Sequence, residues 1–235
     1  MYKRILLKLS GEALGSKENV FDIDVMSALG AQIRKIVEEG CEVGIVVGGG
    51  NLVRGKQFEK IGLDRVASDH IGMLGTTLNA MVLAAALEKN GVSAKVMSAT
   101  QVDGVEGIDV EKARKLLKEK TVVIFGGGVG EPYFSTDTGS ALRASEIKAE
   151  VIFMAKNGVD GVYDSDPDSN PNAKRFEELS FDDILKLNLK VIDQTAASLC
   201  KDNGIDAFVF NMSEEDNIYK AVTGKAVGTV IHSGK

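Results

Sequence analysis

Short apolar runs alternate with longer helical patterns along most of this chain. The runs are apolar on both faces, as in strands buried within a parallel sheet that helices cover on both sides. Six strands are predicted, at residues 4–9, 43–47, 94–97, 122–125, 151–155 and 207–210. This alternation indicates βαβ units and places the protein in the α/β class.

The first helix is predicted between the first two strands. Asp22 or Asp24 is suited to be its N-cap, and Gly40 to close its C-terminal end. The apolar residues of this helix recur at a spacing of three or four: Met26, Leu29, Ile33, Ile36 and Val37.

A second helical stretch, residues 68–87, is apolar almost all round. A surface helix would carry a polar face, so this one is expected to be buried, either inside the domain or between subunits. We favour the subunit interface, because a single domain of this size seldom hides a long helix completely. A homo-oligomer is therefore predicted.

One continuous domain, residues 1–235, is predicted, with approximate lobes at 1–150 and 151–235. The composition changes after Ala155, where residues 156–171 hold two of the three prolines and several turn formers. Such a composition predicts an irregular hairpin and loop, a usual place for ligand contacts.

Composition and charge narrow the class of partner. The net charge of −6 provides no basic field for nucleic acid, so an anionic ligand must be held by local donors. We find no secretory segment and no apolar run of transmembrane length, which predicts a cytoplasmic protein without a membrane partner. Cys41 and Cys200 are interpreted as reduced thiols, since their spacing suggests no metal site.

Two glycine clusters follow two of the predicted strands. Residues 48–50 come directly after strand 43–47, and residues 126–130 after strand 122–125. Glycine lets a backbone turn sharply and approach a phosphate closely, and the carboxyl ends of strands are where open α/β sheets bind such ligands. One cluster is compatible with a simple tight turn, but two at equivalent strand ends favour phosphate binding.

Two familiar nucleotide motifs are incomplete. Residues 50–56 match a P-loop, but Gln57 stands where a Ser or Thr hydroxyl must hold magnesium. The second glycine cluster lacks the third glycine of the dinucleotide fingerprint, so a dehydrogenase is a distant alternative.

Lys8 is a charged residue in an otherwise apolar strand. The alternation of a strand could turn it to solvent. However, it stands at the strand end that leads into Ser10 and Gly11, beside the predicted phosphate sites. We interpret it as a cation that contacts transferring phosphate oxygens.

Hydroxyl and carboxylate residues follow the second glycine cluster. Thr136 and Asp137 are suited to cap a helix, while Ser135 and Thr136 are also suited to hold a phosphate. Asp137 could orient a metal-bound water or a lysine.

Three more distant residues carry suitable chemistry. Arg54 could clamp a phosphate, and Asp69 could accept a hydrogen bond from a sugar hydroxyl. Asp193 is compatible with a plain N-cap, and its spacing alone does not bring it to the site.

Five motifs, at residues 8–14, 48–55, 69–74, 132–137 and 159–163, closely resemble those of bacterial uridylate kinases in the amino acid kinase family. The resemblance runs essentially from end to end. It implies a three-layer αβα sandwich with a mostly parallel sheet that transfers the γ-phosphoryl group of ATP, with Mg²⁺, to UMP. It also implies a homohexamer, with GTP as a possible activator and UTP as a possible inhibitor, although residues 15–22 diverge too far to transfer GTP activation.

The resemblance also implies roles for individual residues and assigns none to a protein-bound metal. The catalytic set is Lys8, Asp137 and Asp193. The ATP set, with its nucleoside part in the C-terminal lobe, is Lys8, Leu9, Ser10, Gly11, Gly50, Arg54, Asn157, Tyr163 and Asp166. The UMP set is Gly49, Asp69, Val129, Gly130, Glu131, Pro132, Tyr133, Phe134, Ser135 and Thr136.

Two positions depart from the family pattern. Val129 replaces a threonine and so lacks a hydroxyl donor, and Glu131 replaces an asparagine and adds a negative charge near the expected UMP. Two other functions therefore stay open: a kinase of this family with another acceptor, such as a carboxylate, a carbamate or isopentenyl phosphate, and a non-catalytic nucleotide sensor or storage protein.

Overall fold

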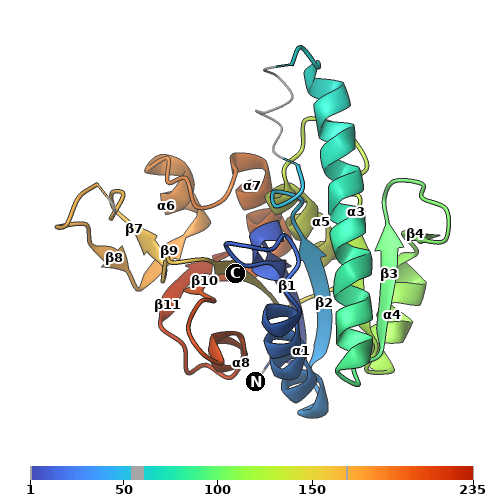
Figure 1. Ribbon diagram of the computed structural model, residues 1–235. Helices are drawn as coiled ribbons and strands as arrows, with labels where there is room; N and C mark the ends of the chain where they lie inside the picture. Colours follow the sequence, from blue (N-terminus) through green and yellow to red (C-terminus); the bar gives the residue numbers. More distant parts are fainter. Residues whose placement is uncertain (1, 54–60, 168, 235) are drawn as a thin grey trace.

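A large twisted sheet runs through the computed structural model, which describes residues 2–53, 61–167 and 169–234 (Figure 1). In this part of the chain the sheet has nine strands in the order β4-β3-β5-β2-β1-β6-β10-β11-β9. The strands are β1 Arg4–Leu9, β2 Glu42–Val47, β3 Ala94–Ser98, β4 Glu106–Gly107, β5 Val122–Gly126, β6 Val151–Lys156, β9 Glu178–Ser180, β10 Asp206–Asn211 and β11 Gly228–His232. All neighbouring pairs are parallel except β10 with β11, which confirms the mostly parallel sheet. The six predicted strands are all present, with ends shifted by at most one residue.

Helices cover both faces of the sheet and confirm the three-layer architecture (Figure 1). One face packs against α1 Ile23–Glu38, α3 Arg65–Lys89 and α8 Asn217–Val222. The other packs against α4 Val110–Lys118, α5 Thr136–Ile147, α6 Phe181–Lys186 and α7 Gln194–Asn203. A short 3₁₀ helix, η1 Gly11–Leu14, follows β1 directly.

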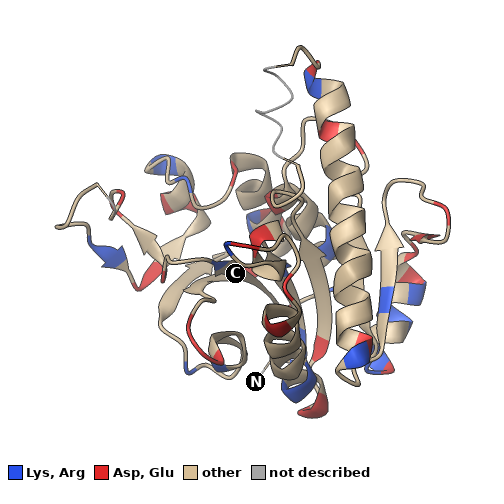
Figure 2. Ribbon diagram, viewed as in Figure 1, with Lys and Arg blue, Asp and Glu red and all other residues tan. Residues whose placement is uncertain are grey.

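The alternation of strand side chains divides the core into two layers. In β1, Ile5, Leu7 and Leu9 belong to the layer beneath α1 and α3, whereas Leu6 belongs to the layer beneath α5 and α7. Because side chains alternate between the faces, Lys8 lies on the same side as Leu6. Figure 2 shows charged residues mainly on the helices and loops, whereas Lys8 lies between the buried residues Leu7 and Leu9 of β1.

The first helix is capped as one of the two predicted alternatives requires. The Asp22 carboxylate accepts hydrogen bonds from the N–H groups of Asp24 and Val25, so Asp22 is the N-cap and Asp24 is not. After the helix, Gly40 adopts a φ of +94°, which favours glycine and lets the chain turn into β2.

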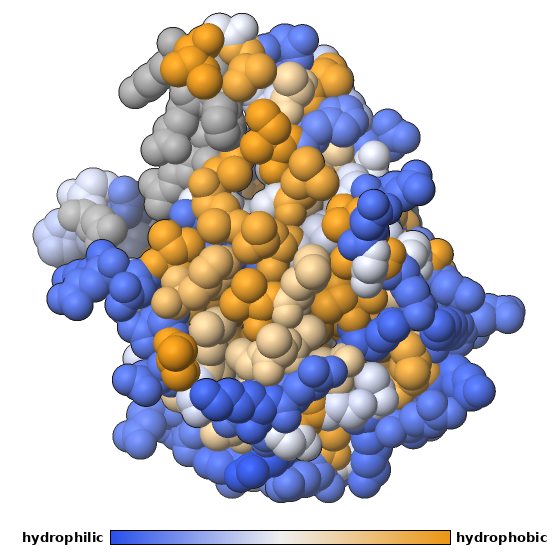
Figure 3. Space-filling view, turned by 45° about the vertical axis from the view of Figure 1, so that its right-hand side comes forward, coloured by the Kyte–Doolittle hydropathy of each residue, from blue (hydrophilic) through white to orange (hydrophobic). Residues whose placement is uncertain are grey.

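Helix α3 is only half buried. Met73, Ala80 and Leu83 face the core, while Leu74, Leu78 and Met81 are exposed in an apolar surface that Figure 3 shows along the helix. Complete burial inside the domain is therefore wrong, and the subunit interface stays a prediction. Among the described helices α3 alone is long and apolar enough to cross a membrane, but half of that stretch is buried in the domain.

The predicted hairpin after β6 is confirmed. β7 Val162–Tyr163 pairs antiparallel with β8 Arg175–Phe176 and forms a separate two-stranded sheet.

The two cysteines are free and buried, and burial raises the pKa of Cys41 and of Cys200 to about 12. Both therefore stay protonated thiols at neutral pH, with low reactivity.

Phe153 at the centre of β6 tests the importance of this core. Its ring makes edge-on contacts with Tyr2, Phe208 and Phe210, and it is almost fully buried. We expect Phe153→Ala to lower the free energy of unfolding by about 3–5 kcal/mol, because a cavity replaces a large apolar side chain. Chemical denaturation measures this, with Val227→Ala at an exposed site as the control. Equal stability of the two variants would contradict the assignment.

Candidate functional site

Four parallel strands end at one edge of the sheet. The register pairs Lys8 on β1 with Val46 on β2 and with Met154 on β6, and β5 lies next to β2. The two glycine clusters are therefore neighbours, as expected from their equivalent strand ends. This edge is where open α/β sheets bind ligands.

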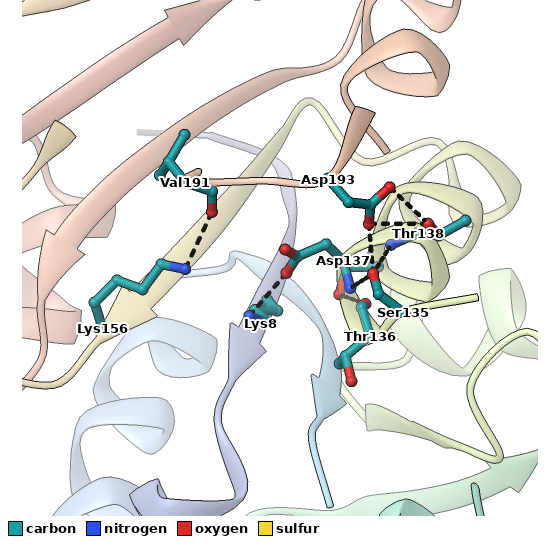
Figure 4. Close-up of polar contacts among 9 residues, drawn as sticks. Lys8, Ser135, Thr136, Asp137, Thr138, Lys156, Val191 and Asp193 are labelled. Carbon is teal, nitrogen blue, oxygen red and sulfur yellow. Dashed lines mark hydrogen bonds and ion pairs between the residues drawn. The ribbon is translucent and has the colours of Figure 1, made fainter. Parts of the chain in front are cut away.

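Lys8 forms an ion pair with Asp137 at this edge. Its ammonium lies 2.8 Å from Oδ1 of Asp137, and the two side chains are only 12% and 18% exposed (Figure 4). The strand turns Lys8 toward α5, so the alternative of a solvent-facing lysine is wrong. Asp137 orients a lysine, which is one of the two roles predicted for it.

The cap of α5 differs from the prediction. Ser135, rather than Thr136 or Asp137, is the N-cap, and its hydroxyl accepts hydrogen bonds from the N–H groups of Asp137 and Thr138. Since Ser135 satisfies these backbone donors, the Asp137 carboxylate is available to Lys8.

Asp193 reaches the same helix end from α7. Its carboxylate accepts hydrogen bonds from the hydroxyls of Ser135 and Thr138, the latter at 3.0 Å (Figure 4). It is also the N-cap of α7, accepting from the N–H of Ala196 at 2.9 Å. Asp193 therefore positions the start of α5, and these hydrogen bonds join it to α5 and α7 and not to Lys8.

Buried polar residues of α3 hold both glycine loops. Asn79 donates to the carbonyl of Gly48 at 2.7 Å, and Thr76 accepts from the N–H of Gly127 at 2.8 Å. Gly127 has a φ of +75°, and a Cβ there would lie 2.6 Å from the nitrogen of Thr100, so only glycine fits. The sequence analysis missed Thr76 and Asn79, although two polar residues three apart in an apolar helix were a usable signal.

A cavity of about 330 Å³ lies beside the glycine loops. Asp69 and Glu131 are among its charged lining residues. Gly50, which the resemblance assigns to ATP, lines this cavity as well. Its wall contains most of the predicted UMP set: Gly49, Asp69, Val129, Glu131, Phe134, Ser135 and Thr136. Gly130, Pro132 and Tyr133 are not in the wall.

Asp69 joins two segments of this cavity. Its Oδ2 accepts from the backbone N–H of Tyr133 at 2.7 Å and from Nε of Arg65 at 2.8 Å. The Arg65 guanidinium lies 5.6 Å from the centroid of the Tyr133 ring. Asp69 therefore holds the loop with residues 132–134 against α3, a structural task beyond the predicted contact with a sugar.

A second cavity, of about 470 Å³, lies beside β6 and the hairpin. Tyr163 and Asp166 of the predicted ATP set line it, and Asn157 does not. Leu189 and Lys190 are shared with a third cavity that extends to Asp137. Asp137 therefore lines the third cavity, and its sequence neighbour Thr136 lines the first.

The rest of the predicted ATP set lies at the end of β1 or cannot be placed. Leu9 is fully buried, so no part of it is exposed to a ligand in this structure. Ser10 precedes η1, and a Cβ on Gly11 would lie 2.9 Å from the backbone carbonyl oxygen of Gly48, which explains the glycine. Arg54 lies outside the described residues.

Lys156 is a basic residue that the sequence analysis missed. It ends β6 and donates from Nζ to the carbonyl of Val191 at 3.2 Å (Figure 4). Burial lowers the pKa of Lys156, and so does the positive charge of Lys8, while Asp137 opposes this shift. The signal was the same as for Lys8, a lysine at the end of an apolar strand.

The described residues contain no group of three or more His, Cys, Asp or Glu side chains that could hold a metal ion. The two carboxylates at this helix end already have partners. Asp137 pairs with Lys8, and Asp193 accepts hydrogen bonds from two hydroxyls. The arrangement as a whole can bind two phosphorylated ligands on either side of a neutral ion pair.

Comparison with known proteins agrees with this geometry. The sequence model of the amino acid kinase family matches residues 3–211. A uridylate kinase of Mycoplasmopsis synoviae (strain 53) is 48% identical over 234 residues, which is 98% of each chain. The predicted resemblance is confirmed.

Solved structures give the same result. UMP kinase from Bacillus anthracis superposes with a TM-score of 0.95 at 39% identity, covering 100% of this chain and 97% of that one. UMP kinase from Ureaplasma parvum gives 0.94 at 38% identity, with 99% of each chain covered. By sequence and by fold, the chain belongs to the amino acid kinase family.

Proposed function

We propose that this protein transfers the γ-phosphoryl group of ATP to UMP and releases UDP and ADP. The observation that carries the proposal is the Lys8–Asp137 ion pair: Asp137 lines a cavity that shares residues with the one beside β6, and it follows Thr136 in the wall of the other. Residues of the UMP set line one cavity, and residues of the ATP nucleoside set line the other. The names of its relatives, uridylate kinase and UMP kinase, support this acceptor.

The reaction needs positioning and charge neutralisation more than covalent help. An oxygen of the UMP phosphate attacks the γ-phosphorus of ATP, and the bond to the β–γ bridging oxygen breaks, leaving ADP. Lys8 neutralises charge on the transferring oxygens, and Asp137 holds its ammonium in place. The glycine loops supply backbone N–H groups, and Asp193 fixes the start of α5 through Ser135 and Thr138.

Mg²⁺ is expected to arrive on the phosphates of ATP. Magnesium usually keeps several waters and binds through one or two carboxylates together with substrate phosphates, without a cage made by the protein. Because Asp137 and Asp193 already have partners in the protein, they fit an ion that arrives with ATP better than a metal site made by the protein alone. When bound, the ion neutralises charge that develops on the phosphates.

A coupled assay of ADP release tests the proposal, with UMP as the sole acceptor. We expect turnover with UMP and none with carboxylate, carbamate or isopentenyl phosphate acceptors. Turnover with one of those alone would favour another kinase of this family. ATP binding without turnover of any acceptor would favour a sensor or storage protein.

Lys8 provides the sharpest test of the mechanism. We expect Lys8→Ala to lower kcat by about 10²–10³-fold, because one preorganised charge at the transferring phosphate is lost. Lys95→Ala, which removes a surface lysine paired with Glu106, should leave kcat unchanged. Near-normal turnover in Lys8→Ala would rule out the role.

Glu131 tests the departure from the family pattern. Glu131 lines the cavity proposed for UMP, where a carboxylate that points inward would repel a nucleotide phosphate. We expect Glu131→Asn to lower the KM for UMP severalfold and to leave the KM for ATP unchanged. If the KM for UMP stays the same, the side chain points away from the nucleotide.

We also propose that the protein is a cytoplasmic homo-oligomer, with a hexamer as the resemblance implies. The exposed apolar surface of α3 supports a contact between subunits (Figure 3). Activation by GTP and inhibition by UTP stay predictions, which the coupled assay checks when each nucleotide is added.

The apolar surface of α3 can be tested directly. We expect the double variant Leu78→Glu, Met81→Glu to form smaller species than the wild type, because four charges would meet across each contact between paired surfaces. Analytical ultracentrifugation measures this, with Val227→Glu at another exposed apolar site as the control. A wild-type monomer would refute the interface.

A further inference from the structure

Lys8 and Lys156 occupy related positions on neighbouring strands. β1 and β6 are parallel, with Lys8 opposite Met154, so Lys156 lies two residues further along β6. Met154 belongs to the core layer beneath α5 and α7, and side chains two residues apart share a face. Both lysines therefore extend on the side of the sheet where Asp137 and Asp193 lie (Figure 4).

The distance between the two lysines suits a chain of phosphates. Neighbouring strands lie about 4.8 Å apart and two residues rise about 6.6 Å, which places the two Cα atoms roughly 8 Å apart. The electrostatic influence of Lys8 and Asp137 on Lys156 shows that the charged ends are also close. Two flexible ammonium groups at this separation can contact different phosphates of one triphosphate.

Lys156 also connects the two parts of the site. It lines the cavity with Tyr163 and Asp166, which the nucleoside of ATP is proposed to occupy. Lys8 and Asp137 stand where the γ-phosphate must be. A triphosphate that extends from that cavity toward Lys8 therefore passes the Lys156 ammonium.

The resting partner of Lys156 is weak for a charged group. In the structure the Lys156 ammonium donates a hydrogen bond to one neutral carbonyl, that of Val191, at 3.2 Å. A phosphate oxygen carries a full charge and makes a stronger hydrogen bond with an ammonium than a carbonyl does. Exchange of the carbonyl for a phosphate would thus be favourable.

We propose that Lys156 is a second phosphate-binding cation of the donor site, which leaves the Val191 carbonyl and contacts a phosphate of ATP on the side away from UMP. This inference rests on the proposed function, because it takes ATP as the occupant of that cavity. Lys8 then serves the transferring phosphoryl group, and Lys156 serves the phosphates that remain in ADP.

A structural role is the competing explanation. Lys156 ties the end of β6 to the segment before α7 through Val191, so its loss could simply loosen the cavity. Lys156→Gln separates the two roles, since the amide can still donate to the carbonyl but carries no charge. Lys156→Arg keeps the charge and serves as the matched control.

Isothermal titration with ATP, ADP and adenosine tests the proposal on the full-length protein. We expect Lys156→Gln to weaken the binding of ATP and ADP by about 10- to 100-fold, the value of a charge-assisted hydrogen bond, and to leave adenosine unchanged. Lys156→Arg should recover much of the loss. Thermal melting of each variant verifies that it is folded, and the KM for UMP should not change.

Two results would overturn the proposal. Equal weakening of ATP and adenosine would show that Lys156 only shapes the cavity, and unchanged affinity for all three would show that it has no role there. These measurements need no acceptor, so they are distinct from a failure of the proposed function, which would appear as absent turnover of UMP by the wild type.

Discussion

The parallel direction of β1, β2, β5 and β6 is the constraint on which the site depends. Parallel strands place all their carboxyl ends at one edge, so whatever follows each strand must meet there. Lys8, two glycine loops and Lys156 are separated by long stretches of sequence and come together for this reason alone. The helices that cover each face then supply the polar side chains at this edge, from α3 on one face and from α5 on the other. Lys8 lies on the same face of the sheet as Leu6, the face that α5 covers, and there it forms an ion pair with Asp137.

Helix α3 connects this site to the outer surface. Its inner face carries Thr76 and Asn79, which hold the two glycine loops through buried hydrogen bonds, and its outer face is apolar and exposed. An unsatisfied buried polar group is costly, so the positions of the loops and of the helix are coupled. A contact that another subunit makes with the outer face would therefore bear on the same rigid element that holds the loops.

The strands, the glycine clusters and Lys8 could be predicted because their signals are local: apolar runs, backbone requirements and one charge out of pattern. Asp193, Thr76 and Asn79 could not be placed, since their partners are distant in sequence and only the packing of α3, α5 and α7 brings them together. The cap of α5 was missed by one residue for a related reason. Ser135, Thr136 and Asp137 are all acceptable caps, and the sequence does not show that Asp137 pairs with Lys8 while Ser135 caps the helix.

An acidic protein that binds two polyanions must concentrate its positive charge locally, and the ion pair shows how it does so at low cost. Alone, two half-buried ammonium groups on adjacent strands would repel each other, and the pKa of Lys156 is lowered first by burial and second by the charge of Lys8. Asp137 compensates one of them, and the dipole of the Val191 carbonyl compensates part of the other. Asp137 and Asp193 together equal the two lysines in formal charge, so the site without substrate is close to neutral, although Lys156 donates to a carbonyl and not to a carboxylate. A donor phosphate that enters would give Lys156 a charged partner in place of the carbonyl and would also contact Lys8, so both lysines would stabilise the phosphoryl group in transfer.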